Sequence, residues 1–193
     1  MSILVLTSDT LIGTPAAGNL EYNGQFYGTD SNASRAQLQR IVLSTAVAST
    51  SGTSIDFTGL PAWVEKITVM FSGVSTSGSS NLLVQLGDSG GVETTGYTSV
   101  VGNNAATATS TAGLIATSNG AAGSVLSGIM TIISISTNAW VSGVTLGDTT
   151  NTQTPYAGGG SKSTSATLDR VRITTVNGTD TFDAGSVNII YEG

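Results

Sequence analysis

The chain of 193 residues contains no cysteine and no histidine. Without cysteine there is no disulfide framework and no thiolate metal site. Without histidine, the usual zinc sites and the commonest general base are excluded as well. These absences leave only oxygen-ligated sites for hard cations such as Ca²⁺. We therefore expect the protein to work without a cofactor.

Charged residues are also scarce. They make up 9% of the chain, whereas an average globular protein has about 25%. The six Lys and Arg residues, against 12 Asp and Glu, are scattered and form no basic stripe, so nucleic-acid binding is not expected. Because the cores of interfaces are depleted in charge, a large buried subunit interface would explain part of the deficit.

Long hydrophobic runs are missing too. The longest apolar-leaning stretch, residues 125–135, is interrupted by Ser, Gly and Thr. It is too short to span a bilayer, so we expect no membrane insertion. The first ten residues lack the positively charged region of a signal peptide.

Apolar residues recur at a period of two, which is typical of half-buried strands. In residues 65–74, Ile67, Val69 and Phe71 alternate with more polar positions. Gly128 falls inside another such segment, where it indicates a bulge or a close approach of two backbones. The pattern predicts an all-β fold, an antiparallel, jelly-roll-like β-sandwich over residues 41–193. The predicted strands are 41–49, 53–57, 65–74, 81–87, 124–136, 139–147, 167–176 and 186–193.

Residues 1–40 form a separate region, an extended amino-terminal arm. It contains the segment LEYNGQFYG, in which Asn23-Gly24 favours a two-residue type I′ turn between two strands. In that register Leu20, Tyr22 and Tyr27 share one face of the hairpin, and Phe26 lies on the other. A lone hairpin is marginally stable in water, so we expect these four residues to contact a partner. Residues 31–39 are compatible with one helical turn or with an extended linker.

Two polar stretches, residues 87–113 and 147–166, exceed the usual length of a loop. They contain Tyr97 and Tyr156, and Trp140 begins a predicted strand between them. Tyr and Trp stack on sugars and anchor interfaces because they join an apolar ring to a polar tip. We predict that these three residues bind a receptor. The alternative is that each ring packs against its own loop.

Other motifs have weaker chemical meaning. GGGSKST at 158–164 has Ser rather than Gly before the Lys, so we interpret it as a flexible loop rather than a phosphate-binding loop. Four carboxylates are compatible with turn or surface roles, with a glycosidase pair, or, at the first and third, with a Ca²⁺ site. We assign no catalytic and no metal-binding residue. The four carboxylates are Asp88, Glu93, Asp148 and Asp169.

Three longer stretches carry a resemblance that covers nearly the whole chain. They are GNLEYNGQFYGTDSNASRAQL, DFTGLPAWVEKITVMFSGVSTSGSSNLLVQLGDSGGVETTGY and LDRVRITTVNGTDTFDAGSVNIIYEG. Together they resemble tail-fibre and related virion appendage proteins of tailed bacteriophages. The resemblance implies a homotrimer, an arm (residues 1–40) that attaches to other tail or capsid proteins, and a carboxy-terminal domain at the distal tip. The chain departs from the pattern in having no long shaft of repeats.

We therefore expect a non-enzymatic structural protein on the exterior of the phage particle, a tail fibre that binds a glycan or protein of the host cell surface. A head fibre or decoration protein of the capsid is the first alternative. A small glycan-cleaving virion enzyme is the second.

Overall fold

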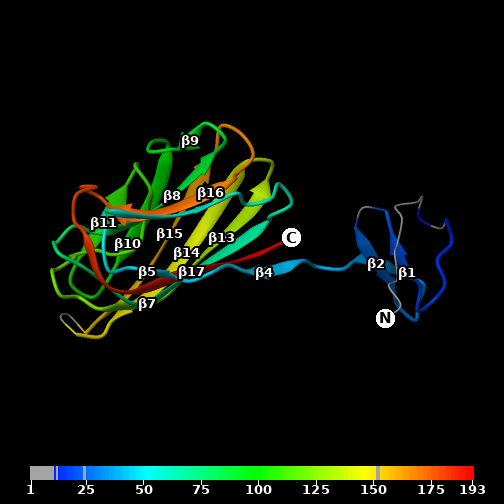
Figure 1. Cartoon of the computed structure of the whole chain (residues 1–193), viewed down its shortest axis with the longest axis horizontal. Coiled ribbons are helices and arrows are strands. Elements are labelled where there is room, and N and C mark those ends of the chain that lie inside the picture. Colours follow the sequence, from blue (N-terminus) through cyan, green and yellow to red (C-terminus); the bar gives the residue numbers. More distant parts are fainter. Residues whose placement is uncertain (1–10, 12, 24, 151–152) are drawn as a thin grey trace. The chain divides into compact units, whose positions relative to one another are not determined.

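The structure is a computed structural model that describes residues 11, 13–23, 25–150 and 153–193. The chain divides into two compact units, residues 1–40 and 41–193. The boundary falls where the composition changes in the sequence. No helix occurs among the described residues (Figure 1).

The first unit is a three-stranded antiparallel sheet of β1 (Leu20–Tyr22), β2 (Phe26–Thr29) and β3 (Arg35–Gln37). Of the two possibilities left open for residues 31–39, the structure shows an extended segment that pairs with β2. The carboxylate of Asp30 fixes the turn before β3. It accepts hydrogen bonds from the backbone N–H groups of Asn32 and Ser34, both at 2.9 Å.

The predicted register of the hairpin is wrong by one residue. Tyr22 pairs with Phe26, so three residues connect β1 and β2 rather than two. Gly24, on which the turn type depends, lies outside the described residues. Because side chains alternate along a strand, Phe26 now shares a face with Leu20 and Tyr22, and Tyr27 lies on the other face. The rings of Tyr22 and Phe26 confirm this arrangement, with centroids 4.9 Å apart.

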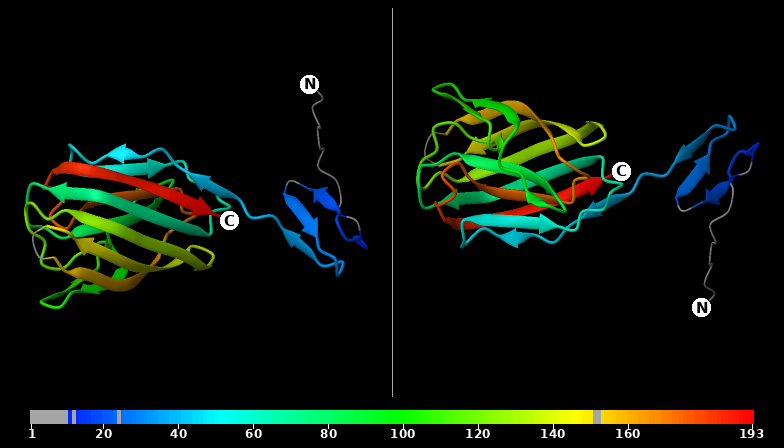
Figure 2. Two further views of the ribbon diagram at one scale, coloured as in Figure 1. Left: turned by 90° about the horizontal axis from the view of Figure 1, so that it is seen from below. Right: turned by 90° about the horizontal axis from the view of Figure 1, so that it is seen from above.

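The second unit consists of two antiparallel sheets, in accordance with the predicted all-β fold. Figures 1 and 2 show the sheets as stacked layers. The larger sheet has the order β11-β10-β15-β14-β13-β7-β17-β4, and β5 also pairs with β17. Its strands are β4 (Ile41–Leu43), β5 (Val47–Ala48), β7 (Lys66–Thr76), β10 (Tyr97–Gly102), β11 (Thr107–Ser110), β13 (Leu126–Ser136), β14 (Ala139–Asp148), β15 (Pro155–Ser163) and β17 (Phe182–Glu192).

The smaller sheet has the order β12-β8-β16-β6, and β9 also pairs with β8. The described strands are therefore divided nine to five, less evenly than in a jelly roll of two four-stranded sheets. The strands of the smaller sheet are β6 (Ser54–Thr58), β8 (Leu82–Asp88), β9 (Gly91–Val92), β12 (Leu114–Ile115) and β16 (Arg170–Thr175).

The hydrophobic core lies between the two sheets. In β7, the alternation expected from the sequence is present, with Ile67, Val69 and Phe71 buried. β16 contributes Val171 and Ile173 from the opposite layer. These side chains belong to one continuous buried cluster, which holds the sheets together by removing apolar surface from water.

Gly128 in β13 lies beside a bulge and at a close approach of two backbones, the two features that the sequence indicated. The register against β7 shifts between Leu126 and Gly128, and Gly128 has a φ of +143°. A Cβ atom at this position would lie 2.3 Å from the carbonyl oxygen of Thr145. Only glycine therefore fits this close approach of β13 to β14.

The two long polar stretches are not loops, and this prediction is wrong. Residues 87–113 contain β9, β10 and β11, and residues 147–166 contain β15. The GGGSKST segment lies mostly in β15, paired on both sides with β10 and β14, and is not a flexible loop. Its glycines fit the sheet tightly, because a Cβ atom at Gly158 would lie 2.2 Å from the carbonyl oxygen of Val100.

Candidate functional site

Two of the three predicted receptor-binding residues are buried in the core. Tyr97 in β10 is 2% exposed and Tyr156 in β15 is 1% exposed. The Tyr97 hydroxyl accepts a hydrogen bond from the N–H of Leu86 at 2.7 Å and lies 2.9 Å from the carbonyl oxygen of Glu93. Burial raises the pKa of Tyr97. Because both residues lie on strands and point inward, neither ring can contact a receptor, which corrects the prediction.

Trp140 differs from these two tyrosines. It too is buried, 5% exposed, so its ring face is not available for the stacking that the sequence suggested. However, Trp140 lines a pocket of about 440 Å³ at the end of the β13–β14 hairpin. The expected exposure of its ring is therefore wrong, and its role in receptor binding stays a prediction.

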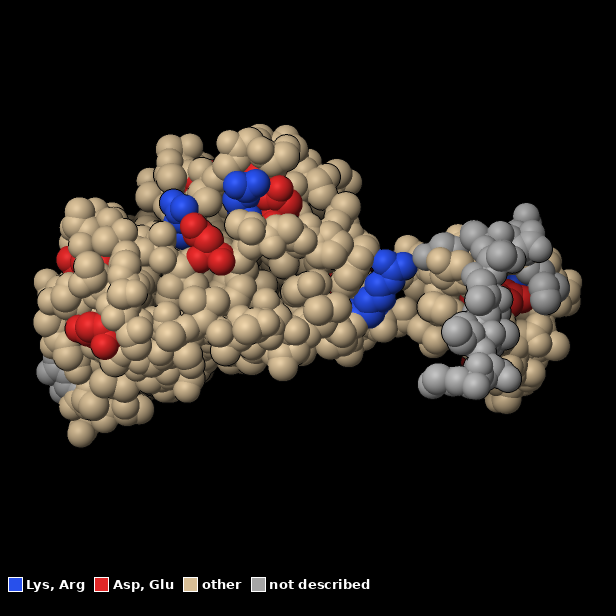
Figure 3. All heavy atoms as spheres, in the orientation of Figure 1, with Lys and Arg blue, Asp and Glu red and all other residues tan. Residues whose placement is uncertain are grey.

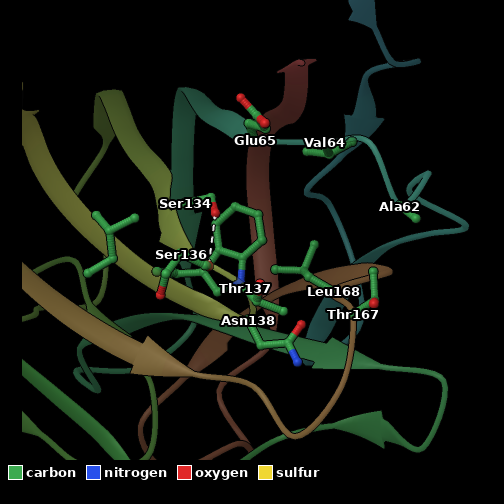
Figure 4. Close-up of a pocket in the computed structure, with 11 residues that line it drawn as sticks. Ala62, Val64, Glu65, Ser134, Ser136, Thr137, Asn138, Thr167 and Leu168 are labelled. Atoms are coloured by element: carbon green, nitrogen blue, oxygen red, sulfur yellow. Dashed lines mark hydrogen bonds between the residues drawn. The ribbon is translucent and has the colours of Figure 1, made fainter.

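The pocket is built from three separate segments of the chain. Figure 4 shows the β13–β14 turn on one side and residues 62–64 and 167–168 on the other. These segments precede β7 and β16, so the pocket opens where the strands of both sheets begin or end. Its lining residues are Ala62, Val64, Glu65, Ser134, Ile135, Ser136, Thr137, Asn138, Trp140, Thr167 and Leu168.

Backbone hydrogen bonds hold these segments together. The N–H of Ser134 donates to the carbonyl oxygen of Glu65 at 2.8 Å, and the N–H of Thr164 donates to that of Asn138 at 2.8 Å. The β13–β14 register shifts between Ser134 and Ser136, and Asn138 adopts a φ of +61°. Residues 137–138, which separate two of the predicted strands, form the turn between β13 and β14. The irregular end of β13 before this turn presents short polar side chains to the pocket.

The polar groups of the pocket are mostly uncharged. Hydroxyl and amide side chains come from Ser134, Ser136, Thr137, Asn138 and Thr167. Buried Val64 and Leu168 supply an apolar surface beside them. Glu65, which is exposed, is the one ionisable side chain among the lining residues.

The indole nitrogen of Trp140 is an unusual feature of this site. It is buried, and it has no hydrogen-bond partner among the described residues. Buried N–H groups are nearly always paired, because an unmade hydrogen bond leaves the cost of desolvation uncompensated. An orphaned donor on a residue that lines a pocket therefore indicates where an acceptor is needed.

The four carboxylates considered in the sequence do not line this pocket. Asp88 and Asp148 end β8 and β14, and each accepts a hydrogen bond from the N–H two residues later, at 2.8 and 3.0 Å. A serine hydroxyl also bonds each of them, Ser165 to Asp88 at 2.5 Å and Ser124 to Asp148 at 2.7 Å. These contacts close strand ends, as turn carboxylates do.

The other two carboxylates form ion pairs. Asp169 bonds both Nε and Nη2 of Arg170, at 2.6 and 3.1 Å. Glu93 forms an ion pair with the buried ammonium group of Lys162. Partial burial opposes ionisation of Glu93, but the hydrogen bond and charge of Lys162 outweigh it, so the pKa of Glu93 is lowered. The hydrogen bond from Ser165 likewise lowers the pKa of Asp88.

The described part of the chain also bears on metal binding and on membrane insertion. No group of three or more acidic side chains there is arranged to hold a metal ion. Over the same residues, no helix is long and apolar enough to cross a membrane. Comparisons with protein-family models, with curated proteins and with solved structures found no match.

Proposed function

We propose that this protein is a non-enzymatic bacteriophage virion protein, a tail-fibre appendage whose β-sandwich binds a component of the host cell surface. The observation that carries the proposal is the pocket around Trp140. Its volume of about 440 Å³ lies in the range of ligand sites, and its lining combines apolar and uncharged polar groups. The resemblance to phage appendages supplies the biological setting.

The lining of the pocket favours binding over glycan cleavage. Glycoside hydrolysis uses two carboxyl groups about 5–10 Å apart. Glu65 is the one carboxylate that lines this pocket. Asp88, Glu93 and Asp148 bond neighbouring side chains elsewhere. We therefore propose binding rather than catalysis at this site.

The surface of the sandwich suits repeated weak adhesion. Figure 3 shows few charged groups on the visible face, and several basic groups lie directly beside acidic ones. Arg172 and Asp56, for example, form a two-pronged pair at 2.7 and 2.8 Å. A surface with few charged groups limits nonspecific electrostatic attraction. Many copies on one particle would then turn weak individual contacts into firm attachment.

A homotrimer is part of the proposal. The outer face of the larger sheet exposes Ile41 and Leu43 of β4 and Ile129 and Ile133 of β13, between 43% and 62% exposed. β7 and β17 lie between these two strands, and exposed apolar side chains on one face of a sheet support an interaction surface. Light scattering on a sizing column tests this: a trimer has a mass of about 58 kDa, three times the chain mass of 19.3 kDa.

The arm has its own support in the first unit. Leu20 and Phe26 are 59% and 44% exposed, and they share one face with Tyr22. We propose that this face docks on another tail or capsid protein. The same face would serve a capsid head fibre or decoration protein equally well, which keeps that location as the second candidate. In both cases the protein lies on the exterior of the particle.

The test is made on phage particles and on the purified full-length chain. We expect labelled protein to be found on the tail by electron microscopy, and excess free chain to slow adsorption of the phage to its host. Labelling on the head would favour the decoration protein. Particles that lack the protein, or adsorption unaffected by excess chain, would refute the tail-fibre proposal.

The arm is tested with a matched pair of variants. Phe26→Ser changes the apolar face, whereas Tyr27→Ser changes the opposite face of the same strand. We expect Phe26→Ser to reduce incorporation into particles much more than Tyr27→Ser does. Equal incorporation of both variants at wild-type level would contradict docking through this face.

A further inference from the structure

We infer that the ligand of the Trp140 pocket is a neutral saccharide unit, one of whose oxygen atoms accepts a hydrogen bond from the Trp140 indole N–H. The inference rests on the proposed function, because it names the class of host-surface molecule that this pocket binds. It is carried by the orphaned, buried indole nitrogen and by the chemistry of the residues around it.

The orphaned donor requires an acceptor. Trp donates but cannot accept a hydrogen bond. Trp140 is buried within the sandwich, with 5% of the residue exposed. The ligand therefore recognises the N–H edge rather than the ring face. A sugar offers hydroxyl and ring oxygens that accept such a bond.

The rest of the lining matches a sugar in kind. Ser136, Thr137 and Thr167 are exposed hydroxyl residues, and the Asn138 amide can donate and accept at once. These groups suit a ligand that carries several hydroxyls. Val64 and Leu168 supply apolar contacts for the C–H groups of a sugar ring.

The charge of the site selects against acidic sugars. Glu65 is exposed among the lining residues, and no basic side chain lines the pocket to offset it. The chain as a whole also has a net charge of −6. A uronate or sialate would be repelled, whereas a neutral sugar can donate hydroxyl hydrogen bonds to the Glu65 carboxylate.

Access to the nitrogen requires a small movement of the rim. The nitrogen has less than 1 Å² of exposed surface. Ser136 and Thr137 are exposed, at a point where the ladder between β13 and β14 is already irregular. These residues are therefore the part of the wall that can shift with little loss of packing when the saccharide enters.

The two tryptophans of the chain make the test direct. A ¹H–¹⁵N spectrum of the full-length protein contains two indole N–H signals, and the variant Trp63→Phe assigns them. We expect glucose, galactose, mannose or N-acetylglucosamine at millimolar concentration to shift the Trp140 signal. The Trp63 signal, from a residue that does not line the pocket, should move less.

Variants then distinguish the loss of the indole hydrogen bond to the ligand from an effect on folding. Trp140→Phe keeps an aromatic ring but removes the donor, and we expect affinity for the active sugar to fall at least about fivefold, as for one lost hydrogen bond. Because this variant changes the core, Thr167→Val provides a second test at an exposed lining position. Thr58→Val, on the exposed face of β6, is its matched control and should leave binding unchanged.

The charge argument has a separate variant. Glu65→Gln should allow glucuronate to bind. Binding of the neutral sugar should change little, because the amide oxygen of the new side chain still accepts a hydroxyl hydrogen bond. If glucuronate bound the wild-type chain as well as the neutral sugar does, the neutral specificity would be wrong.

Failure of this inference can be distinguished from failure of the proposed function. If the chain binds host cells but no neutral sugar shifts the Trp140 signal, or Trp140→Phe binds equally well, the saccharide assignment is refuted and the adhesion proposal stands. Binding to cells that survives periodate oxidation of the cells but is lost on protease treatment would also refute the saccharide assignment, and would indicate a protein receptor. If the chain binds no host cells at all, the proposed function itself fails.

Discussion

The ion pair between Lys162 and Glu93 should contribute measurably to the free energy of unfolding of this fold, which has few charged residues. The Lys162 side chain is 6% exposed, donates to the carbonyl oxygen of Thr95 at 2.9 Å, and lies 5.0 Å from the centroid of the Tyr97 ring. Removing one partner of a buried pair costs about 3–5 kcal/mol, because the other charge is left uncompensated. Glu93 is 20% exposed and thus partly solvated, so we expect Lys162→Met to lower the free energy of unfolding by about 2 kcal/mol.

The expected loss belongs to the pair rather than to the lysine alone. The double variant Lys162→Met/Glu93→Gln leaves no unpaired charge and should recover part of the stability, with a coupling energy of about 1–2 kcal/mol. Lys66→Met is the matched control, because the Lys66–Glu192 pair is at 2.9 Å but the lysine is 40% exposed. Its cost should stay below about 1 kcal/mol.

The assay is equilibrium unfolding in urea at one protein concentration, followed by circular dichroism. The pKa of Glu93 is lowered in the folded protein from its ordinary value of 4.5. Its ionised form therefore stabilises the fold above that value, and this contribution is lost as the pH falls through the folded pKa. The difference between wild type and Lys162→Met should shrink below about pH 4.5 for this reason. Equal costs for Lys162→Met and Lys66→Met, or no coupling in the double variant, would refute the reasoning.

Three further predictions concern backbone and surface positions. Gly128→Ala should lower the free energy of unfolding in urea by at least about 2 kcal/mol, since φ is +143° and the new Cβ meets a carbonyl oxygen of β14. Gly143→Ala is the control, because a Cβ there meets nothing within 4 Å, and it should cost less than about 1 kcal/mol. Similar costs for the two variants would contradict the close approach of β13 to β14. Arg172→Ala removes an exposed ion pair and should change stability by no more than about 1 kcal/mol, less in high salt; a larger, salt-independent loss would be contrary to this. Ser165→Ala should raise the pKa of Asp88 toward 3.8, measured by NMR titration, because it removes the hydroxyl that bonds the carboxylate; an unchanged pKa would assign the shift to the backbone donors instead.

The strands that were predictable from the sequence are those with apolar side chains on the inner face. β7 buries Ile67, Val69 and Phe71, and β16 buries Val171 and Ile173, so the period of two is visible in these parts of their sequences. β15 could not be predicted in this way, because Gly158 and Gly160 occupy inward positions where other strands have large apolar residues. Its place in the sheet depends on backbone hydrogen bonds to both neighbours, which leave no hydrophobic period.

The pocket could be predicted only in part. Trp140 was selected for its ring, but the sequence could not show that the ring is buried while its N–H lacks a partner. Residues 62–65 and 167–168 are far from Trp140 in the sequence. They meet it because β7 pairs with β13 and because the β15–β16 connection returns the chain to the other sheet. Such a site depends on the order of the strands, which periodicity does not encode.

The corrected register of the arm changes its physical character. With Tyr22 opposite Phe26, one face of the three-stranded sheet carries Leu20, Tyr22 and Phe26, and the exposed Leu38 continues it through its N–H bond to the Phe26 carbonyl oxygen at 2.8 Å. The opposite face carries Tyr27 and an ion pair, Arg35 Nε to Glu21 Oε2 at 2.8 Å. The predicted register would have mixed these two kinds of side chain. The observed one separates them, so the exposed apolar side chains gather on one face and gain by leaving water, whereas Glu21 on the opposite face is already buried. Docking of the arm on a partner protein is therefore expected through the face that contains Phe26.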